Sequence, residues 1–312
     1  MSKRAWLFPG QGSQVVGMGA QVLARSQRAR DVFARADEAL GESLSKLILE
    51  GPTETLTLTA NAQPALVTTC FAILEALRED GDLPAPDFAA GHSLGEYTAL
   101  VAAGALTFED AVRVVRARGV AMQDAVPAGV GAMAAIMSLD ESVLAGICAA
   151  ASQGDERAEM ANFNAPGQIV IAGSKDAVLR ASAAAGEAKG RAIPLNVSAP
   201  FHSSLMKPAA ERLAAVLETI VVSPLAFPVV ANVDAEPNAS PERVKELLVR
   251  QVAGAVRWEQ SVRFLEAQGV TTALEIGPGK VLAGLVKRTT KSIQVTSLDG
   301  SSSGGPSATA TA

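Results

Sequence analysis

The chain has 312 residues, of which 48% are hydrophobic and 19% charged, so it can bury a large core as one large or two smaller domains. Its net charge of −5 argues against a nucleic-acid or anionic-membrane partner, and no stretch approaches the ~20 apolar residues of a membrane span. With 2 cysteines and 2 histidines it has no disulfide framework or metal cluster to build, and we expect a cytoplasmic protein.

The N-terminal part predicts strands that alternate with helices. A short strand at 5–8 runs into the glycine-rich segment PGQGSQ, and helical patterns follow to about Leu49. Pro64 is expected to open the next helix, because proline is tolerated in a first turn. A strand at 87–90 then leads through a glycine turn into a helix that ends near Val101. This alternation predicts a mostly parallel sheet covered on both faces, an α/β fold.

The middle of the chain has a different order of elements. Residues 128–197 predict a strand, a helix, two strands, a helix and a strand, which is the ferredoxin-like order β-α-β-β-α-β. We therefore expect a small ferredoxin-like domain inserted into a large α/β-hydrolase-like domain formed by residues 1–127 and 198–300. Residues 301–312 contain only Ser, Gly, Ala, Thr and Pro, and we expect them to be disordered.

The larger pattern resumes after the insertion. Prolines interrupt an apolar stretch that ends at Val233. Ser240 as N-cap and Pro241 at the first helical position predict the start of another helix. Residues 271–290 predict a strand, a glycine turn and a helix.

The segment GHSLG at 91–95 has the G-x-S-x-G spacing of a sharp strand-to-helix turn that exposes its serine, Ser93. A serine hydroxyl becomes a good nucleophile only when a base accepts its proton. His92 is adjacent on the turn and should point elsewhere, so His202 is the candidate base. The motif alone is weak, and a lone loop histidine is more often a surface or packing residue. The preceding strand and the following apolar helix favour the catalytic interpretation.

Acyl transfer also requires N–H donors that face the developing oxyanion. In this architecture one donor is the main-chain N–H of the residue after the nucleophile, here Leu94. Another comes from an earlier strand-to-helix loop, where Gln11 fits. The same loop could be a dinucleotide-binding fingerprint, but Val15 occupies the place of the third glycine.

Arg118 lies in the middle of the apolar face of a helix predicted within 107–126, whereas Arg113 and Arg116 point the opposite way. A guanidinium on a buried face needs an anionic or strongly accepting partner. Two possibilities stay open: a core carboxylate or a set of main-chain carbonyls, and a substrate carboxylate held bidentately near Ser93.

Hydrolases of this fold class place an acid between the serine and the histidine in chain order. None of the carboxylates between Ser93 and His202 follows a clear strand end. A neutral acceptor, such as a main-chain carbonyl, would then orient the imidazole.

Motifs across residues 4–300 resemble the malonyl-CoA:acyl carrier protein transacylase family, which is related to the acyltransferase domains of polyketide synthases. They include FPGQGSQ, GHSLGEYTALVAAGAL, RARGVAMQ, NFNAPGQIVIAG, VSAPFHSSLM and EIGPGKVL, in the order of the family. The resemblance implies Ser93 as nucleophile and His202 as base, with the main-chain carbonyl of Gln251 orienting the imidazole in place of an acid.

The resemblance also implies the roles of the residues around this pair. The amides of Gln11 and Leu94 would form the oxyanion hole, and Arg118 would pair with the free carboxylate of malonate. Phe201, directly before His202, is similar to the residue found in malonyl-selective members.

The activity implied by the resemblance is ping-pong transfer of malonyl from malonyl-CoA to the phosphopantetheine thiol of acyl carrier protein, which supplies extender units for fatty acid biosynthesis. No cofactor, metal, nucleic acid or membrane is implied. Because carrier proteins are typically acidic, we expect basic residues beside the cleft. The candidates are Lys189, Arg191, Lys280, Lys287 and Arg288.

Two other functions stay open from the sequence. A serine thioesterase or esterase would use the same Ser93 and His202 but pass the acyl group to water; Arg118 and the lack of an evident acid argue against it. A catalytically silent subunit that binds a carrier protein is disfavoured because nucleophile, base and oxyanion loop are all intact.

Overall fold

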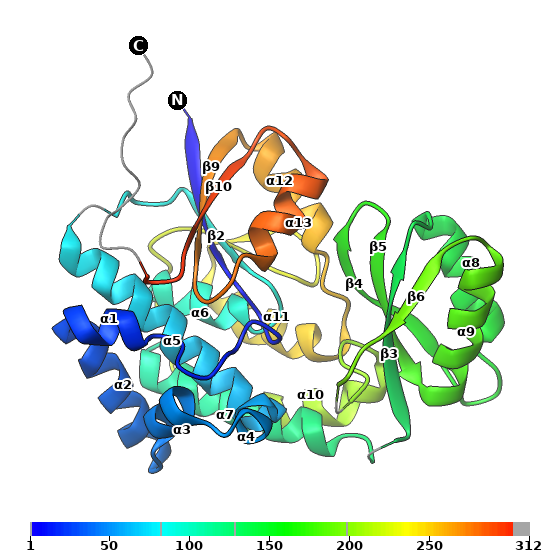
Figure 1. Cartoon of the computed structure of the whole chain (residues 1–312), viewed down its shortest axis with the longest axis horizontal. Helices are drawn as coiled ribbons and strands as arrows, with labels where there is room; N and C mark the ends of the chain where they lie inside the picture. The colour runs from blue at the N-terminus through cyan, green and yellow to red at the C-terminus, as the bar shows by residue number, and fades with distance from the viewer. Residues whose placement is uncertain (1, 82, 128, 198, 302–312) are drawn as a thin grey trace.

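The computed structural model describes residues 2–81, 83–127, 129–197 and 199–301, so the predicted tail lies outside the described residues from 302 onward. Figure 1 shows two sheets side by side, each with its own helices. The larger sheet has the strand order β10-β9-β1-β2-β7-β8, and its neighbours are parallel except for β7 and β8. Its strands are β1 (Lys3–Phe8), β2 (Phe88–Gly91), β7 (Val229–Val230), β8 (Pro237–Asn238), β9 (Val270–Ile276) and β10 (Gln294–Leu298).

The central strand β1 is buried on both faces, as expected for a parallel sheet. Trp6 and Phe8 join the core on one side, and Ala5 and Leu7 join the core on the other. One core is covered by α1 (Ala20–Arg25), α2 (Gln27–Leu40), α3 (Leu44–Glu50), α4 (Thr53–Thr57), α5 (Thr59–Asp80), α6 (Gly95–Ala102), α7 (Phe108–Asp124), α10 (Lys207–Glu218) and α11 (Pro241–Ala253). The other core is covered by α12 (Trp258–Ala267) and α13 (Val281–Thr289). The predicted alternation of strands and helices is therefore confirmed.

The prediction that Pro64 opens a helix was wrong, because Pro64 lies inside α5, which begins at Thr59. A proline cannot donate to the carbonyl four residues earlier, which here belongs to Ala60. Arg116 Nη1 of α7 donates to that carbonyl instead, at 2.8 Å. The two helices can come this close because α7 has Gly119 at the contact, where a Cβ would lie 2.7 Å from the Thr59 carbonyl oxygen. A tertiary contact thus stabilises a turn that the local sequence does not favour.

Residues between Gly131 and Pro194 form the second sheet, whose strand order is β4-β5-β3-β6 and whose neighbours are all antiparallel. Two helices cover one face of it and enclose a separate apolar core (Figure 1). The elements follow the predicted order: β3 (Gly131–Met137), α8 (Glu141–Ala151), β4 (Ala158–Ala165), β5 (Gln168–Ser174), α9 (Lys175–Glu187) and β6 (Arg191–Pro194).

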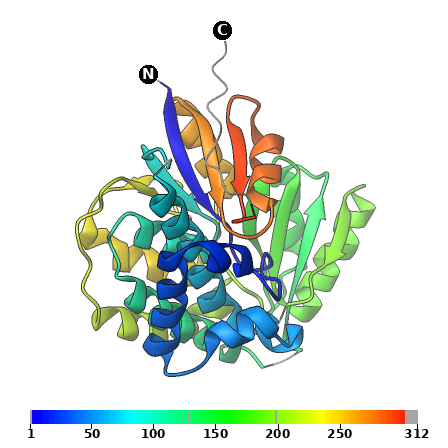
Figure 2. The ribbon, with the colours of Figure 1, turned by 60° about the vertical axis from the view of Figure 1, so that its left-hand side comes forward.

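Main-chain hydrogen bonds join β4 of the second sheet to the segment between α11 and α12. Phe163 N donates to Val256 O at 2.8 Å, and Val256 N donates to Ala161 O at 2.9 Å. Figure 2 shows the second sheet beside the helices of the first. After β6 the chain returns to the larger part of the molecule through the short helix η1 (Ser204–Met206). Ser240 and Pro241 begin α11 as predicted. No described helix has the length and apolar character needed to span a membrane.

Candidate active site

Ser93 lies on the turn between β2 and α6, at the carboxyl end of the central strands. Its φ of 49° is left-handed, which is uncommon for a residue other than glycine. The flanking glycines make the turn possible: a Cβ on Gly91 would lie 1.9 Å from the carbonyl carbon of Gly95, and one on Gly95 would lie 2.0 Å from the Phe8 oxygen. The G-x-S-x-G spacing is therefore required by the close approach of α6 to β1 and β2.

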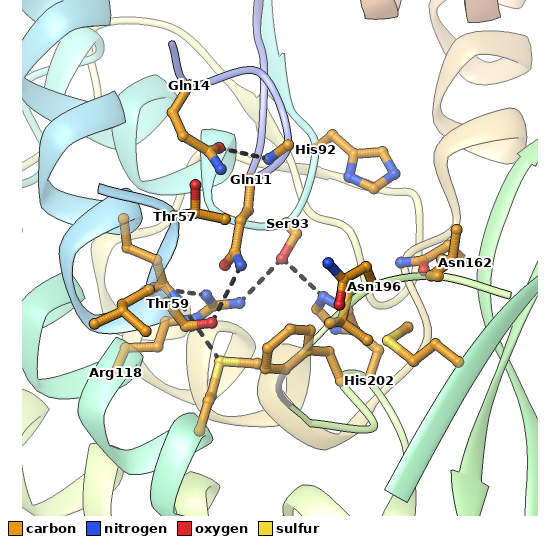
Figure 3. Close-up of a pocket in the computed structure, with 18 of the residues that line it drawn as sticks. Gln11, Gln14, Thr57, Thr59, His92, Ser93, Arg118, Asn162, Asn196 and His202 are labelled. Carbon is orange, nitrogen blue, oxygen red and sulfur yellow. Dashed lines mark hydrogen bonds between the residues drawn. The ribbon is translucent and has the colours of Figure 1, made fainter. Parts of the chain in front are cut away.

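His202 faces the Ser93 hydroxyl from the loop before η1, with 2.7 Å between Nε2 and Oγ (Figure 3). Its Nδ1 lies 2.9 Å from the Gln251 carbonyl oxygen and 3.1 Å from that of Gly254. Because a carbonyl only accepts, Nδ1 carries the hydrogen and Nε2 is left as an acceptor for the serine proton. Two main-chain carbonyls thus orient the ring, so an acid is not needed to set its tautomer.

The imidazole is kept neutral by its surroundings. Burial, and secondly the positive charge of Arg118, lower the pKa of His202 to about 3. A neutral ring has a free lone pair at neutral pH, so His202 is ready to accept a proton from Ser93 without first losing one.

Arg118 reaches the same hydroxyl from α7 and is only 1% exposed. Its Nη2 donates to Ser93 Oγ at 3.1 Å and to Gln251 Oε1 at 2.9 Å, and its Nη1 donates to Gln63 Oε1 at 2.8 Å. Among the described residues, these acceptors are side-chain amides and a hydroxyl, so the structure shows neither the core carboxylate nor the main-chain carbonyls as partners of Arg118. A substrate carboxylate stays a prediction.

Arg118 takes part in no ion pair among the described residues. Arg113, on the same helix, has an exposed side chain and an ion pair with Asp110. The hydrogen-bond partners of Arg118 are neutral, and the buried Glu96 carboxylate acts on it without an ion pair. An anionic group that enters the pocket beside Ser93 would give the guanidinium a direct partner of opposite charge.

The expected oxyanion donors lie on loops at the carboxyl ends of neighbouring strands. Gln11 follows β1 and Leu94 follows Ser93. Neither main-chain N–H donates to an acceptor among the described residues. The loops can approach because a Cβ on Gly10 would lie 2.4 Å from the His92 oxygen. The Gln11 side chain turns away and donates to Thr59 Oγ1 at 3.1 Å, so both N–H groups are available to a ligand.

A pocket of about 470 Å³ between the two sheets is lined by Ser93, His202, Arg118 and Gln11, and Leu94 is not among its lining residues. His92 lines it but points away from Ser93 Oγ, with its Nε2 2.8 Å from Asn164 Oδ1. Phe201, the residue expected to affect selectivity, lines the pocket beside His202. Pockets of this size commonly hold small molecules. His202 and Arg118 therefore both contact the Ser93 hydroxyl, and all three residues line one cavity (Figure 3).

Comparison with known proteins fits this site. Residues 5–309 match the family described as acyl transferase domain. The chain belongs to this acyl transferase family. It is 52% identical over 295 residues to the malonyl CoA-acyl carrier protein transacylase of Bacillus subtilis, covering 94% of this chain and 92% of the relative.

Two solved structures place the same fold in this acyl transferase family. An acyl carrier protein S-malonyltransferase from Vibrio cholerae has a TM-score of 0.92 at 47% identity, covering 95% of this chain and 96% of that one. A malonyl-transacylase in complex with its holo type II PKS acyl carrier protein has a TM-score of 0.92 at 46% identity, covering 96% of both.

The sequence did not reveal all the residues that build this acyltransferase site. Asn232 Oδ1 accepts the Ser93 N–H at 2.6 Å, and its Nδ2 donates to the Gly91 oxygen at 2.7 Å. Asn232 comes just after β7, which pairs with β2, and the carboxyl ends of parallel strands meet at one edge; that rule could have found it. Gln63 was hidden because Pro64 was taken as a helix start.

The five basic residues proposed to bind a carrier protein are exposed, and none lines the pocket. Met137 pairs with both Gln168 and Arg191 across β3, and Arg288 Nη1 donates to Gln168 Oε1. Arg191 and Arg288 are therefore near one end of the second sheet.

Proposed function

We propose that the chain transfers malonyl from malonyl-CoA to the phosphopantetheine thiol of acyl carrier protein through a malonyl-Ser93 intermediate, supplying extender units for fatty acid biosynthesis. The observation that carries this proposal is the buried Arg118 guanidinium, which is within hydrogen-bonding distance of the nucleophile and has no ion-pair partner among the described residues. An acyl group that ends in a carboxylate would place its charge there. The relatives, a malonyl CoA-acyl carrier protein transacylase and an acyl carrier protein S-malonyltransferase, have the same acyl group and acceptor in their names.

In the first half-reaction, His202 Nε2 takes the Ser93 proton as Oγ attacks the malonyl thioester carbon. The negative charge on the thioester oxygen would be stabilised by the N–H groups of Gln11 and Leu94. The C–S bond then breaks, His202 returns the proton to the coenzyme A sulfur, and malonyl-Ser93 remains. Arg118 holds the malonyl carboxylate, which fixes the carbonyl against the serine.

The second half-reaction repeats these steps with another thiol. The phosphopantetheine thiol gives its proton to His202 and attacks the ester carbon. A second tetrahedral oxyanion forms at the same donors, so one oxyanion hole serves both halves. The C–O bond to Ser93 breaks, and His202 returns the proton to Oγ.

The test separates transfer from hydrolysis, which the esterase alternative predicts with the same Ser93 and His202. Labelled malonyl-CoA is mixed with the protein in the presence and absence of holo acyl carrier protein. We expect label on the carrier protein much faster than free malonate in either reaction. Malonate as the main product with carrier protein present would contradict the proposal.

We also propose that residues 128–197 are a ferredoxin-like domain inserted into an α/β-hydrolase-like domain formed by 1–127 and 198–300. The predicted tail lies outside the described residues from 302 onward. The antiparallel order β4-β5-β3-β6 with two helices on one face supports the assignment of the inserted domain. The cytoplasmic location predicted from the two unpaired cysteines, Cys70 and Cys148, stays a proposal. So does the docking of an acidic carrier protein at the five basic residues.

A further inference from the structure

Glu96 is a buried carboxylate close to Ser93 in the chain. Neither half-reaction described above uses it. It lies in the first turn of α6, three residues after Ser93, and is 3% exposed. Its Oε2 accepts from Gln251 Nε2 at 2.9 Å and from Asn232 N at 3.0 Å. A buried acid is expensive unless its interactions repay the lost hydration.

The two partners of Glu96 are the residues that hold the rest of the site. Asn232 binds both sides of the Ser93 turn through its side chain. Gln251 donates to the Ser93 carbonyl oxygen at 2.8 Å, accepts from Arg118 through Oε1, and accepts from His202 Nδ1 through its main-chain oxygen. Nucleophile, base and guanidinium therefore all depend on two residues that meet at one carboxylate oxygen.

The carboxylate also fixes which way the Gln251 amide points. A carboxylate accepts hydrogen bonds and cannot donate them, so the NH₂ group of Gln251 must face Glu96 and its oxygen must face Arg118. The reversed amide would place donors against the guanidinium and an oxygen against the carboxylate. The charges at the two ends of this chain, Arg118 and Glu96, thus favour a single orientation.

We propose that Glu96 is a positioning residue that fixes the Gln251 amide and, through it, holds Arg118 in the geometry that receives the malonyl carboxylate. This inference rests on the proposed function. Glu96→Gln is the informative variant, because it retains the size of the side chain but removes the charge and offers a donor. Only Arg118 and the Ser93 carbonyl oxygen then oppose the reversed amide of Gln251. Glu96→Ala removes the acceptor altogether.

The matched control is Glu275→Gln. Glu275 is fully buried on β9 and accepts from Leu282 N, Ala283 N and Ser297 Oγ, so it is an equally engaged carboxylate outside the pocket. All proteins are assayed at pH 8, because burial raises the pKa of Glu96 to about 7, although the hydrogen bonds from Gln251 and Asn232 and the charge of Arg118 oppose the rise. Formation of malonyl-Ser93 and acetyl-Ser93 is followed by intact mass spectrometry in single turnover. The melting temperature of each variant is measured by thermal unfolding.

Hydrogen bonds to charged groups are worth enough for about tenfold to hundredfold effects. We expect Glu96→Gln to slow malonylation about tenfold and acetylation about twofold or less, and Glu96→Ala to slow malonylation about a hundredfold. Glu275→Gln should lower the melting temperature without changing either rate. Equal losses for the two acyl groups, or a Glu96→Gln protein as fast as the wild type, would overturn the inference. A wild type that forms no malonyl adduct would instead refute the proposed function.

A double-mutant cycle tests whether Glu96 acts through Arg118. In an Arg118→Ala background, Glu96→Gln should slow malonylation about twofold or less, because the guanidinium to be positioned is gone. A full tenfold loss in that background would show that Glu96 acts on Ser93 or His202 alone and would overturn the proposed route.

Discussion

The two basic residues that meet at the Ser93 hydroxyl, His202 and Arg118, are held by different kinds of partner. His202 is bound by two main-chain carbonyls, and its depressed pKa leaves it neutral. Arg118 is bound by the side-chain amides of Gln63 and Gln251, and takes part in no ion pair among the described residues. The same hydroxyl thus has a proton acceptor on one side and a positive charge on the other.

This difference indicates a division of labour. Main-chain carbonyls are fixed by the fold, which suits a base whose tautomer must not change. Side-chain amides are weaker partners for a guanidinium than a carboxylate is, so Arg118 can bind a ligand anion without breaking an ion pair. The histidine side would set the rate of proton transfer, and the arginine side would decide which acyl group is accepted.

The largest effects are expected on the histidine side and at the nucleophile. Ser93→Ala should abolish the covalent malonyl adduct, because it removes the hydroxyl that His202 Nε2 contacts at 2.7 Å. His202→Ala should slow acylation by about 10³-fold or more, since the hydroxyl loses its base. Intact mass in single turnover measures both. A malonyl adduct on the Ser93→Ala protein, or an unchanged acylation rate in His202→Ala, would contradict the proposed mechanism. It would also contradict the roles assigned to His202 and Arg118.

A smaller and selective effect is expected on the arginine side. Arg118→Ala should slow malonylation about a hundredfold, the upper range for a charge-assisted hydrogen bond, and leave acetylation nearly unchanged. Arg113→Ala, on the exposed face of the same helix, is the matched control and should retain both rates. If Arg118→Ala reduced the two acylation rates equally, the guanidinium would have only a structural role.

The two sides are also linked electrostatically, since Arg118 lowers the pKa of His202 after the larger effect of burial. The His202 ring should therefore stay neutral from pH 8 to pH 5, and Arg118→Ala should raise its pKa. Proton NMR of a chain with 2 histidines can follow this titration, with His92→Gln to assign the signals. Titration of His202 near pH 6.5 in the wild type would contradict the neutral-base account.

The same shift gives the sign of a stability change with pH. The folded-state pKa of His202 lies below the unfolded value of 6.5, so between these values the unfolded chain binds a proton that the native state does not. The contribution of His202 to the free energy of unfolding is therefore present above pH 6.5 and is lost as the pH falls towards 3. Chemical denaturation of wild type and His202→Gln across this range measures it.

The smallest effect is expected outside the pocket. Reversing the exposed charges of Lys287 and Arg288 should raise the KM for acyl carrier protein by about threefold to tenfold, as rim charges act mainly on association. Transfer to a small thiol should be unaffected. Reversing Arg28 on α2 and Lys46 on α3, which are both exposed, changes the net charge by the same amount and is the control. An unchanged KM would remove this surface from the proposal but leave the comparison around Ser93 intact.

The sequence predicted the elements well where local patterns determine them. The glycines around Ser93 and the apolar face that contains Arg118 are set by sterics and by helical periodicity, and both can be read along the chain. Pro64 was misplaced because the start of α5 depends on Arg116 and on the close approach of α7, which are tertiary contacts.

The supporting residues of the site were less visible in the sequence. Asn232, Gln63 and the side chain of Glu96 act through hydrogen bonds to segments far away in the chain. Single polar residues in helices have no local pattern that distinguishes them from surface residues, and Asn232 could be found only from the position of its strand in the sheet. The sequence therefore indicated the reacting groups but not the network that orients them.

The central claim is that Arg118 receives the carboxylate of the acyl group, and a crystal structure of the malonyl-Ser93 intermediate would test it most directly. We predict that both carboxylate oxygens lie within hydrogen-bonding distance of the Arg118 guanidinium, while His202 Nδ1 stays on the Gln251 and Gly254 carbonyls. A malonyl group whose carboxylate points to solvent, with Arg118 still bound only to Gln63 and Gln251, would contradict the account.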